Sequence, residues 1–171
     1  RLEACIANIK KFHTDAKMCI ITGDLTDQGH RKAYHDFREI LQKLPMPYHP
    51  LIGNHDHREI FSEIFPEVPL DEQGFVQQML TTEQGRFLLL DTVKHKNDEG
   101  IYCEKRGAWL RTKLEESGNE NVYLFMHHPP FKIGIPALDR IKLQDGVELI
   151  QEIVSDFSNI KHLFFGHVHR P

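Results

Sequence analysis

The chain has 171 residues, of which 40% are hydrophobic and 27% charged, a composition that suits one globular domain with a real core. Its formal net charge of −4 excludes the basic surplus with which proteins neutralise a nucleic acid backbone, so bulk nucleic acid is not an expected partner. The longest apolar run, Val122–Met126, is far shorter than the roughly 20 residues of a membrane-spanning helix. Cys5, Cys19 and Cys103 are odd in number and widely spaced, which argues against a disulfide framework and favours a soluble protein of the reducing cytoplasm.

The first half of the chain predicts three helices and two short buried strands. Apolar residues at helical spacing and bounding glycines and prolines place the helices at Leu2–Phe12, His30–Lys43 and His57–Phe65, and the strands at Met18–Thr22 and Tyr48–Ile52. Asp56 is followed three residues later by Glu59, which is the pattern of a capping box. We therefore expect Asp56 to begin the third helix, with the amide end of that helix directed at a bound anion.

The second half continues the alternation of strands and helices. Strands are predicted at Phe75–Leu80 and Arg86–Val93, on either side of the turn Thr81–Gly85, and at Val122–Met126 and His162–Phe165. Helices are predicted at Gly107–Glu116 and Gly146–Phe157. A turn is predicted at Asp98–Gly100 and a loop at Pro129–Pro136. The strands are apolar throughout rather than alternating, which is typical of sheets covered on both faces. The order of elements predicts a layered α/β fold.

Polar clusters directly follow four of the predicted strands. They are Gly23-Asp24, Gly53-Asn54-His55-Asp56, His127-His128 and Gly166-His167-Val168-His169. Because the carboxyl ends of strands in an open α/β sheet meet at one edge, these clusters are expected to form a single site. Oxygen and imidazole ligands without thiolate suit divalent Mn, Fe, Zn or Co. The sequence therefore predicts a divalent metal site.

At these residues the chain resembles the calcineurin-like metallophosphoesterases, whose motifs D-x-H, G-D, G-N-H-D/E, x-x-x-H and G-H-x-H follow one another in this order. Four of the five are present, at 23–24, 53–56, 124–127 and 166–169. The wider segments 23–29 and 126–130 are most similar to the branch that contains bacterial class III cyclic-nucleotide phosphodiesterases and glycerophosphodiester phosphodiesterases. The resemblance covers essentially the whole chain and implies the α/β/β/α sandwich of the metallo-dependent phosphatases.

The resemblance also implies a role for each motif residue. The metal ligands it implies are Asp24, Asn54, His127, His167 and His169. Asp24 corresponds to a carboxylate that bridges two divalent transition metal ions, and His169 belongs to the second of these metals. His55 corresponds to the histidine that contacts the phosphoryl group and assists the departing alkoxide, so Asp24 and His55 are the expected catalytic residues.

One motif of the family is not in the chain. The D-x-H strand is expected before the helix Leu2–Phe12, so the resemblance implies that residues 1–171 are a single metallophosphoesterase domain without its first strand and its C-terminal strands. The implied activity is hydrolysis of small phosphodiesters, either 3',5'-cyclic nucleotides or glycerophosphodiesters, by attack of a metal-bridging hydroxide on phosphorus. A phosphomonoesterase of the same superfamily and a non-catalytic scaffold with the same fold are the alternatives, and the sequence leaves a homo-oligomer open.

Four further residues border the motifs. Asp56 and Asp27 are candidates to orient metal ligands through hydrogen bonds, and for Asp56 the capping of a helix is an equal account. His128 is expected to contact substrate or to support a ligand. His57 either touches substrate or is a solvated side chain of the first helical turn.

Overall fold

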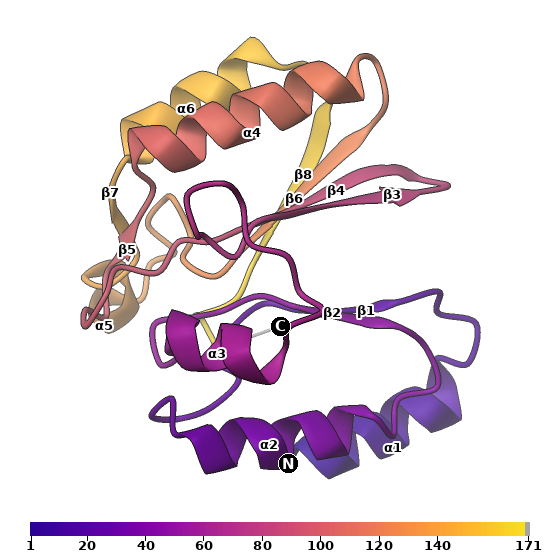
Figure 1. Cartoon of the computed structure of the whole chain (residues 1–171). Helices are drawn as coiled ribbons and strands as arrows, with labels where there is room; N and C mark the ends of the chain where they lie inside the picture. Colours follow the sequence, from indigo (N-terminus) through magenta and orange to yellow (C-terminus); the bar gives the residue numbers. More distant parts are fainter. Residues whose placement is uncertain (170–171) are drawn as a thin grey trace.

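The structure is a computed structural model that describes residues 1–169. Its elements in chain order are α1 (Leu2–Phe12), β1 (Cys19–Ile21), α2 (Arg31–Leu41), β2 (Tyr48–Pro50), α3 (Arg58–Ile64), β3 (Gln78–Thr82), β4 (Gly85–Leu90), β5 (Gly100–Ile101), α4 (Glu104–Ser117), β6 (Val122–Met126), α5 (Pro136–Asp139), β7 (Leu143–Asp145), α6 (Val147–Asp156) and β8 (Ile160–Phe165). Helices α1 to α3 cover a sheet of β1 and β2, and helices α4 and α6 cover a second sheet of β3, β4, β6 and β8 (Figure 1). The predicted α/β/β/α layering is confirmed.

The smaller sheet consists of β1 and β2, which run parallel. The space between this sheet and its helices is filled by a core that includes Tyr34, Phe37, Phe61 and Phe65. Both strands are shorter than predicted, because their pairing ends at Ile21 and Pro50. Beyond these two residues the chain leaves the sheet and enters the loops that carry the polar clusters.

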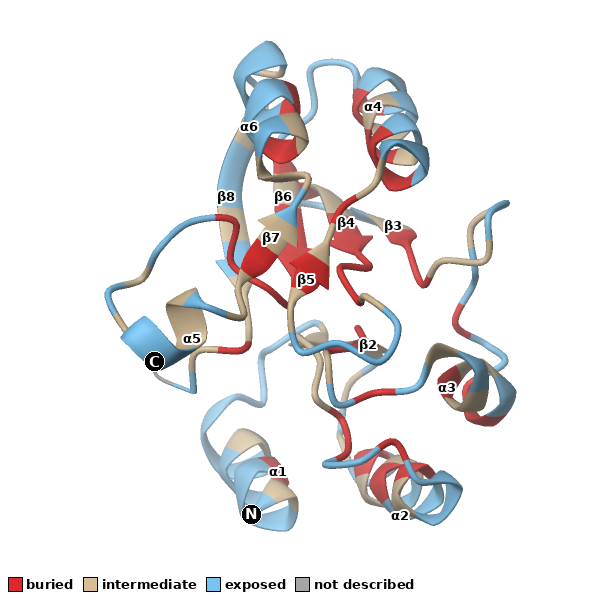
Figure 2. Ribbon diagram, turned by 90° about the vertical axis from the view of Figure 1, so that its left-hand side faces the viewer, coloured by how far each residue is buried: buried red, intermediate tan, exposed pale blue. Residues whose placement is uncertain are grey.

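The larger sheet has the order β3-β4-β6-β8. Strands β3 and β4 form an antiparallel hairpin around the predicted turn, and β4, β6 and β8 run parallel. Parallel strands share the edge at which their carboxyl ends lie, so Met126 of β6 is paired with Phe165 of β8 immediately before their polar clusters. In Figure 2 the buried residues of α4 and α6 lie on the sides that face this sheet.

Alternate residues of the central strands face different layers. Leu88 and Leu90 pack with the core beneath α4 and α6, whereas Leu89 packs with Leu51 and Phe125 between the two sheets. Successive side chains of a strand point to opposite faces, so a strand with a core on each face is apolar at every position. This arrangement is the physical reason for the unbroken apolar runs in the sequence.

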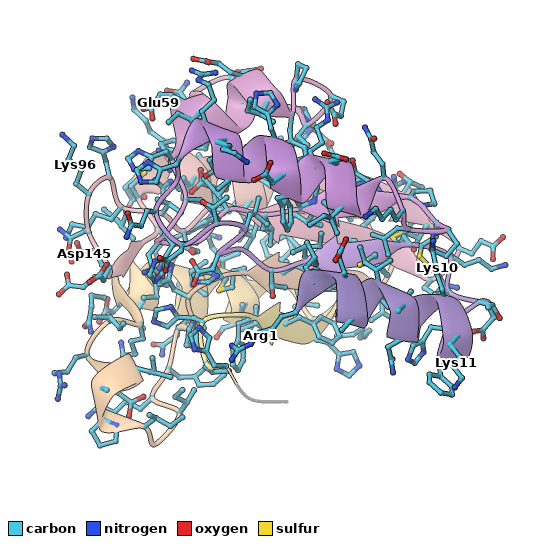
Figure 3. All side chains as sticks on the ribbon, turned by 90° about the horizontal axis from the view of Figure 1, so that it is seen from below. Arg1, Lys10, Lys11, Glu59, Lys96 and Asp145 are labelled. Carbon is cyan, nitrogen blue, oxygen red and sulfur yellow. The ribbon has the colours of Figure 1, made fainter. Side chains whose placement is uncertain are left out.

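A third, two-stranded sheet joins segments that the sequence did not predict as strands. β5 pairs in parallel with β7, and Lys94, in the loop between β4 and β5, forms an ion pair with Asp145 at 2.9 Å. Figure 3 shows Lys96 of the same loop and Asp145 at one end of the molecule, with Lys10 and Lys11 at the other. The sequence predicted only a turn at Asp98–Gly100 here and missed the strand that begins at Gly100. Pairing between segments distant in the chain leaves no local sequence pattern.

The predicted helices are confirmed apart from their ends, and one short helix was not predicted. α4 begins at Glu104, three residues before the predicted Gly107, and the short helix α5 begins at Pro136, where the predicted loop ends. Helix ends are the least determined part of a sequence pattern, since they depend on packing as well as on capping residues. Among residues 1–169, no helix combines the length and the apolar composition needed to cross a membrane.

Candidate metal centre

The loop after β1 carries Asp24 and passes close to His127, which follows β6. Gly23 has a φ of 93°, and a Cβ atom at this position would come within 2.5 Å of His127 Nδ1. Only glycine therefore lets the end of β1 pass this close to His127. The residue that follows, Asp24, also has a positive φ of 53°, as do His167 (68°) and His169 (52°). Such backbone strain in residues other than glycine is characteristic of functional sites.

Four side-chain atoms from four separate loops converge at one point. Asn54 Oδ1 lies 3.1 Å from His127 Nε2 and 3.1 Å from His167 Nδ1, and the two histidine nitrogens are 3.2 Å apart. Asp24 Oδ2 lies 3.3 Å from His127 Nε2. The structure thus brings together four of the residues that the sequence predicts as metal ligands.

The converging atoms include more hydrogen-bond acceptors than hydrogen-bond donors. His127 Nδ1 donates to the carbonyl oxygen of Thr22 at 2.7 Å, so Nε2 of a neutral ring carries a lone pair. That lone pair faces Asn54 Oδ1 and Asp24 Oδ2, which are acceptors as well. Among the described residues, His167 Nε2 is a buried atom without a hydrogen-bond partner. Convergent acceptors of this kind fit a divalent cation, and the ligand types suit Mn, Fe, Zn or Co.

The pKa values of two of these groups agree with a cation site. Burial raises the pKa of Asp24, but the hydrogen bond and charge of His127, present only when its ring is protonated, and the backbone N–H of His55 outweigh burial and lower the pKa to about 2. Burial, together with the neighbouring His127, lowers the pKa of His167 to about 4. At neutral pH, Asp24 is therefore ionised and His167 keeps a free lone pair, which are the states that a metal ligand needs.

His55 is an exposed residue that contacts this cluster through its backbone. Its backbone N–H donates to Asp24 Oδ1 at 3.2 Å, and its ring Nδ1 donates to the carbonyl oxygen of Asp27 at 2.7 Å. This ring hydrogen bond, aided by nearby carboxylates, outweighs partial burial and raises the pKa of His55. With Nδ1 engaged, Nε2 is the atom that can reach a ligand. Asp27 acts here through its backbone, since its carboxylate is 88% exposed and 3.9 Å from the ring, which corrects the expectation that its side chain orients a metal ligand.

His169 borders the same hollow without joining the four-atom cluster. The hollow has a volume of about 500 Å³, and Asp24, His127, His167 and His169 all line it. His169 is exposed, whereas His127 and His167 are buried. The structure therefore separates the four converging residues from a fifth that faces the open space beside them.

Asp56 is not the cap of a helix, which corrects the sequence prediction. Helix α3 begins at Arg58, after an N-cap residue, His57, that makes no side-chain capping bond. The buried Asp56 carboxylate instead accepts hydrogen bonds from the backbone N–H groups of Leu25 (3.0 Å), Thr26 (3.3 Å) and Gly53 (2.8 Å) and from the Tyr34 hydroxyl (2.9 Å). Asp56 thereby ties the loop that carries Asp24 to the loop that carries Asn54.

His57 and His128 occupy different surroundings. His57 is exposed, and its ring borders a cavity of about 80 Å³ beside Asn54 and Lys96. His128 is fully buried, which disfavours a contact with substrate and leaves the support of a metal ligand as the other role expected for it. Burial and the neighbouring His127 and His167 hold the pKa of His128 well below its usual value. One ring nitrogen of His128, one of His127 and one of His167 lie within 4.8 Å of one another.

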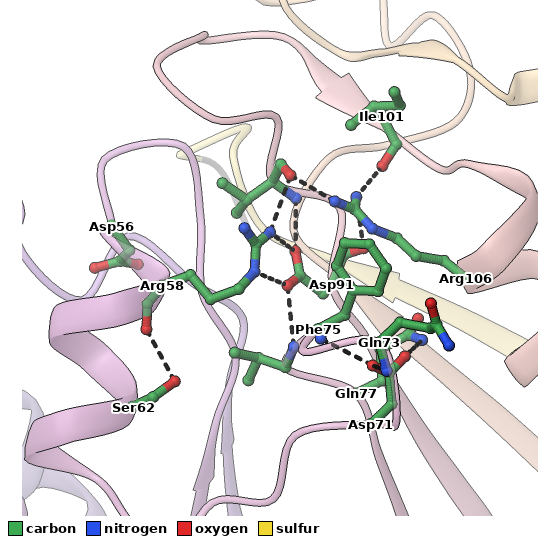
Figure 4. A network of polar contacts seen from close by, with 12 residues as sticks. Asp56, Arg58, Ser62, Asp71, Gln73, Phe75, Gln77, Asp91, Ile101 and Arg106 are labelled. Carbon is green, nitrogen blue, oxygen red and sulfur yellow. Dashed lines mark hydrogen bonds and ion pairs between the residues drawn. The ribbon is translucent and has the colours of Figure 1, made fainter.

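A buried ionic network that was not predicted from the sequence surrounds Asp91 (Figure 4). The Arg58 guanidinium donates two hydrogen bonds to Asp91, at 2.7 and 2.9 Å, and the Asp91 side chain is completely buried. Arg106 donates to the carbonyl oxygens of Asp91, Ile101 and Val93. The ring of Phe75 lies 5.5 Å from the Arg58 guanidinium and 4.2 Å from that of Arg106. A polar residue directly after the apolar strand Leu88–Leu90 was the available signal for Asp91.

The sequence of this chain resembles those of known proteins along its whole length. The sequence model of the family described as calcineurin-like phosphoesterase matches residues 1–171. A probable cyclic nucleotide phosphodiesterase of Rhodopseudomonas palustris is 38% identical, over 100% of this chain and 63% of that protein. A probable glycerophosphodiester phosphodiesterase of Arcobacter nitrofigilis is 33% identical, over 99% of this chain and 62% of that protein. The 3',5'-cyclic adenosine monophosphate phosphodiesterase of Escherichia coli K12 is 26% identical, over 98% and 60%. The chain thus spans less than two thirds of the length of these relatives.

A solved structure shares the fold. A crystal structure of a Thermus thermophilus protein superposes with a TM-score of 0.61, covering 96% of this chain and 74% of that one at 16% identity. At this identity the likeness concerns the fold alone. The match of the family over all residues, together with a relative 38% identical along the whole chain, decides the family. The chain belongs to the calcineurin-like phosphoesterases.

Proposed function

We propose that this protein is a divalent-metal phosphodiesterase that hydrolyses small phosphodiesters. The observation that carries the proposal is the convergence of Asp24 Oδ2, Asn54 Oδ1, His127 Nε2 and His167 Nδ1 at separations of 3.1 to 3.3 Å. The names of the relatives, cyclic nucleotide and glycerophosphodiester phosphodiesterases, support a diester with small substituents as the substrate. The three free thiols of Cys5, Cys19 and Cys103 agree with a reducing, cytoplasmic location, which stays a prediction.

Asp24, Asn54, His127 and His167 are the proposed ligands of one divalent cation. His169 borders the same hollow and is the proposed ligand of a second cation, which Asp24 would share. Bound divalent cations supply the Lewis acidity that makes water nucleophilic at neutral pH and stabilises charge on a phosphoryl group. The remaining ligands of the second cation, which the resemblance places on a D-x-H strand, stay a prediction.

His55 is the proposed group that acts on the phosphoryl oxygens or on the departing alkoxide. Its raised pKa, caused first by the hydrogen bond to the Asp27 carbonyl oxygen, increases the cationic fraction of its ring near neutral pH. A cationic imidazole can donate a hydrogen bond from Nε2 to an oxygen on which negative charge develops. The bond to Asp27 also holds the ring in place, so its orientation does not have to be established when substrate binds.

The experiment measures metal content and hydrolysis on the longest available form of the protein. We expect stoichiometric metal by elemental analysis after loading with Mn²⁺, and Mn²⁺-dependent hydrolysis of bis(p-nitrophenyl) phosphate. His127→Ala should lose most of both, since it removes an imidazole at the point of convergence. His35→Ala, at an exposed position of α2, is the matched control and should lose neither.

Two results would contradict the proposal and indicate the alternatives. A protein that binds no stoichiometric transition metal has the properties of a scaffold. A protein that binds metal but hydrolyses p-nitrophenyl phosphate in preference to the diester is a phosphomonoesterase.

A further inference from the structure

The ring of His128 is enclosed by protein, and each of its nitrogens has a partner. Its Nδ1 lies 2.8 Å from the hydroxyl oxygen of Thr92, and its Nε2 lies 3.2 Å from the carbonyl oxygen of Asp98. The backbone N–H of His128 donates to the same Thr92 hydroxyl oxygen at 3.3 Å. His128 and Thr92 are both fully buried, so water does not compete for the hydrogen bonds between them, whereas the bond to Asp98 is part-buried because Asp98 lies in an exposed loop.

The chemistry of these partners determines where the proton of the ring lies. A carbonyl oxygen only accepts hydrogen bonds, so Nε2 must carry the hydrogen that points to Asp98. In the neutral ring, Nδ1 is then the acceptor and takes the hydroxyl hydrogen of Thr92. With both nitrogens engaged, His128 has no lone pair for a metal, although it lies beside His127 and His167.

The same ring fills the space between a loop and two proposed metal ligands. Its centroid lies 4.8 Å from the ring of His127, at an interplanar angle of 87°, and 4.9 Å from the ring of His167, at 47°. On another side it contacts Gly100, where a Cβ atom would come within 2.6 Å of His128 Cγ. The ring is thus packed against both ligands and cannot turn without moving them.

Thr92 is itself held in place by the buried network behind the site. It follows Asp91, whose completely buried carboxylate is bound by Arg58 and by the backbone N–H of Val93. Thr92 therefore presents its hydroxyl group from a rigid point of the backbone.

We propose that His128 is a positioning residue, held as the neutral Nε2–H tautomer between Thr92 and Asp98, whose ring sets the orientation of His127 and His167 for metal binding. Thr92 and Asp98 are the groups that select this tautomer. The inference rests on the proposed metal site, but its first test does not need the metal. Residues that hold metal ligands in orientation commonly change metal affinity by 10- to 100-fold when they are altered.

The first measurement is the ¹⁵N spectrum of the imidazole rings in the metal-free protein at pH 7.5, with the His128 signals assigned by their loss in His128→Asn. We expect His128 as a neutral ring with hydrogen on Nε2 and an acceptor nitrogen at Nδ1. A ring with hydrogen on Nδ1, or a mixture of the two tautomers, overturns the proposal. This spectrum can overturn the proposed tautomer even if variants of Thr92 do not fold.

The second measurement compares Mn²⁺ affinity among variants of Thr92. Thr92→Val keeps the shape of the side chain but removes the hydroxyl group, and should weaken Mn²⁺ binding by roughly 10-fold or more. Thr92→Ser keeps the hydroxyl and should restore affinity. The matched control is Thr112→Val on the exposed face of α4, where the hydroxyl donates to the Ala108 carbonyl oxygen of its own helix.

The outcomes separate this inference from the proposed function. Unchanged Mn²⁺ affinity in a folded Thr92→Val overturns the positioning role of His128 while leaving the metal site intact. A lower melting temperature of the metal-free variant with unchanged affinity assigns Thr92 a structural role only, and equally overturns the proposal. If the unaltered protein binds no metal, the proposed function fails, and the positioning role fails with it whatever tautomer the spectrum shows.

Discussion

Tyr34 and Asp56 form a buried pair in which the hydroxyl of Tyr34 donates to the Asp56 carboxylate at 2.9 Å. The same hydroxyl oxygen accepts the backbone N–H of His57 at 2.8 Å. Helix α2, which carries Tyr34, is thereby connected to the segment that carries Asn54 and His55. Through the hydrogen bonds from Leu25, Thr26 and Gly53, the Asp56 carboxylate joins that segment to the loop of Asp24.

Tyr34→Phe tests this pair with little change in shape. The variant removes one of the four hydrogen bonds that Asp56 accepts and leaves the His57 N–H without its partner. We expect the free energy of unfolding to fall by about 1–3 kcal/mol. Urea unfolding measures this change, and Tyr48→Phe, on the half-buried strand β2, is the control. Equal stability of the two variants would show that the Tyr34 hydroxyl contributes nothing to the fold.

Asp56→Asn should be more damaging than Tyr34→Phe. The substitution replaces an accepting oxygen by an amide N–H₂ group that faces backbone donors, so that at least one donor loses its partner. We expect a larger loss of unfolding free energy, and weaker Mn²⁺ binding because the loops of Asp24 and Asn54 are no longer joined. Isothermal titration with Mn²⁺ checks the second effect, and wild-type affinity in a folded variant would refute it.

Metal loading should stabilise the fold. A ligand that binds only the native state at 100 times its dissociation constant stabilises a protein by about 2.7 kcal/mol. For a chain of this size, that corresponds to a rise in melting temperature of roughly 5–10 °C. Differential scanning calorimetry with Mn²⁺ and then with excess EDTA measures the shift, which should be reversed by the chelator.

Asn54→Ala should lose most of this stabilisation, since it removes the oxygen that lies between His127 and His167. Asn119→Ala, at an exposed position after α4, provides the control and should keep the full shift. A metal-dependent shift of equal size in Asn54→Ala would exclude Asn54 as a ligand.

The pair of Arg58 and Asp91 predicts a difference between two substitutions of the arginine. Arg58→Lys cannot donate two parallel hydrogen bonds and leaves the buried Asp91 carboxylate partly unpaired. Arg58→Ala removes the ion pair and leaves the carboxylate the backbone N–H groups of Val76 and Val93. This variant should cost about 3–5 kcal/mol of unfolding free energy, with Arg58→Lys between this value and zero. Arg111→Lys, where the arginine pairs with Glu152 and Asp156 at the surface, should change stability by less than about 1 kcal/mol. Urea unfolding of the three variants measures the loss of unfolding free energy, which should be largest for Arg58→Ala and smallest for Arg111→Lys.

His49 predicts how stability depends on pH. His49 lies on β2 opposite Ile20, which packs against the core between the sheets, and burial lowers the pKa of His49. The unfolded chain therefore binds a proton more readily than the native state does, so the contribution of His49 to stability is complete above the unfolded pKa of about 6.5 and is lost as the pH falls below it. We expect His49→Gln to lose less unfolding free energy than the wild type between pH 7 and pH 5. Parallel stability curves for the two proteins would contradict this assignment.

Local patterns in the sequence determine most of the elements and the membership of the site. The apolar runs that end at glycine or at a polar cluster predict the strands, and the positions of Asp24, Asn54, His127 and His167 after four of them predict that these side chains meet. Within each sheet the inference succeeds because β1 and β2 run parallel, as do β6 and β8, so residues at their carboxyl ends share an edge; the packing of the two sheets then brings the two edges together.

What the tertiary structure alone decides are the contacts between segments distant in the chain. The pattern Asp56-x-x-Glu59 is the same in sequence whether Asp56 caps a helix or not, and only the folded chain brings the N–H groups of Leu25 and Thr26 to its carboxylate. The pairing of β5 with β7, the ion pair of Arg58 with Asp91 and the enclosure of His128 by Thr92 and Asp98 are of the same kind. A hydrogen bond between two buried groups depends on their separation in space, which hydrophobic periodicity does not encode. The sequence by itself therefore determines which residues gather at the site, and the tertiary structure decides which of them converge on the proposed cation position and which contact these residues from behind.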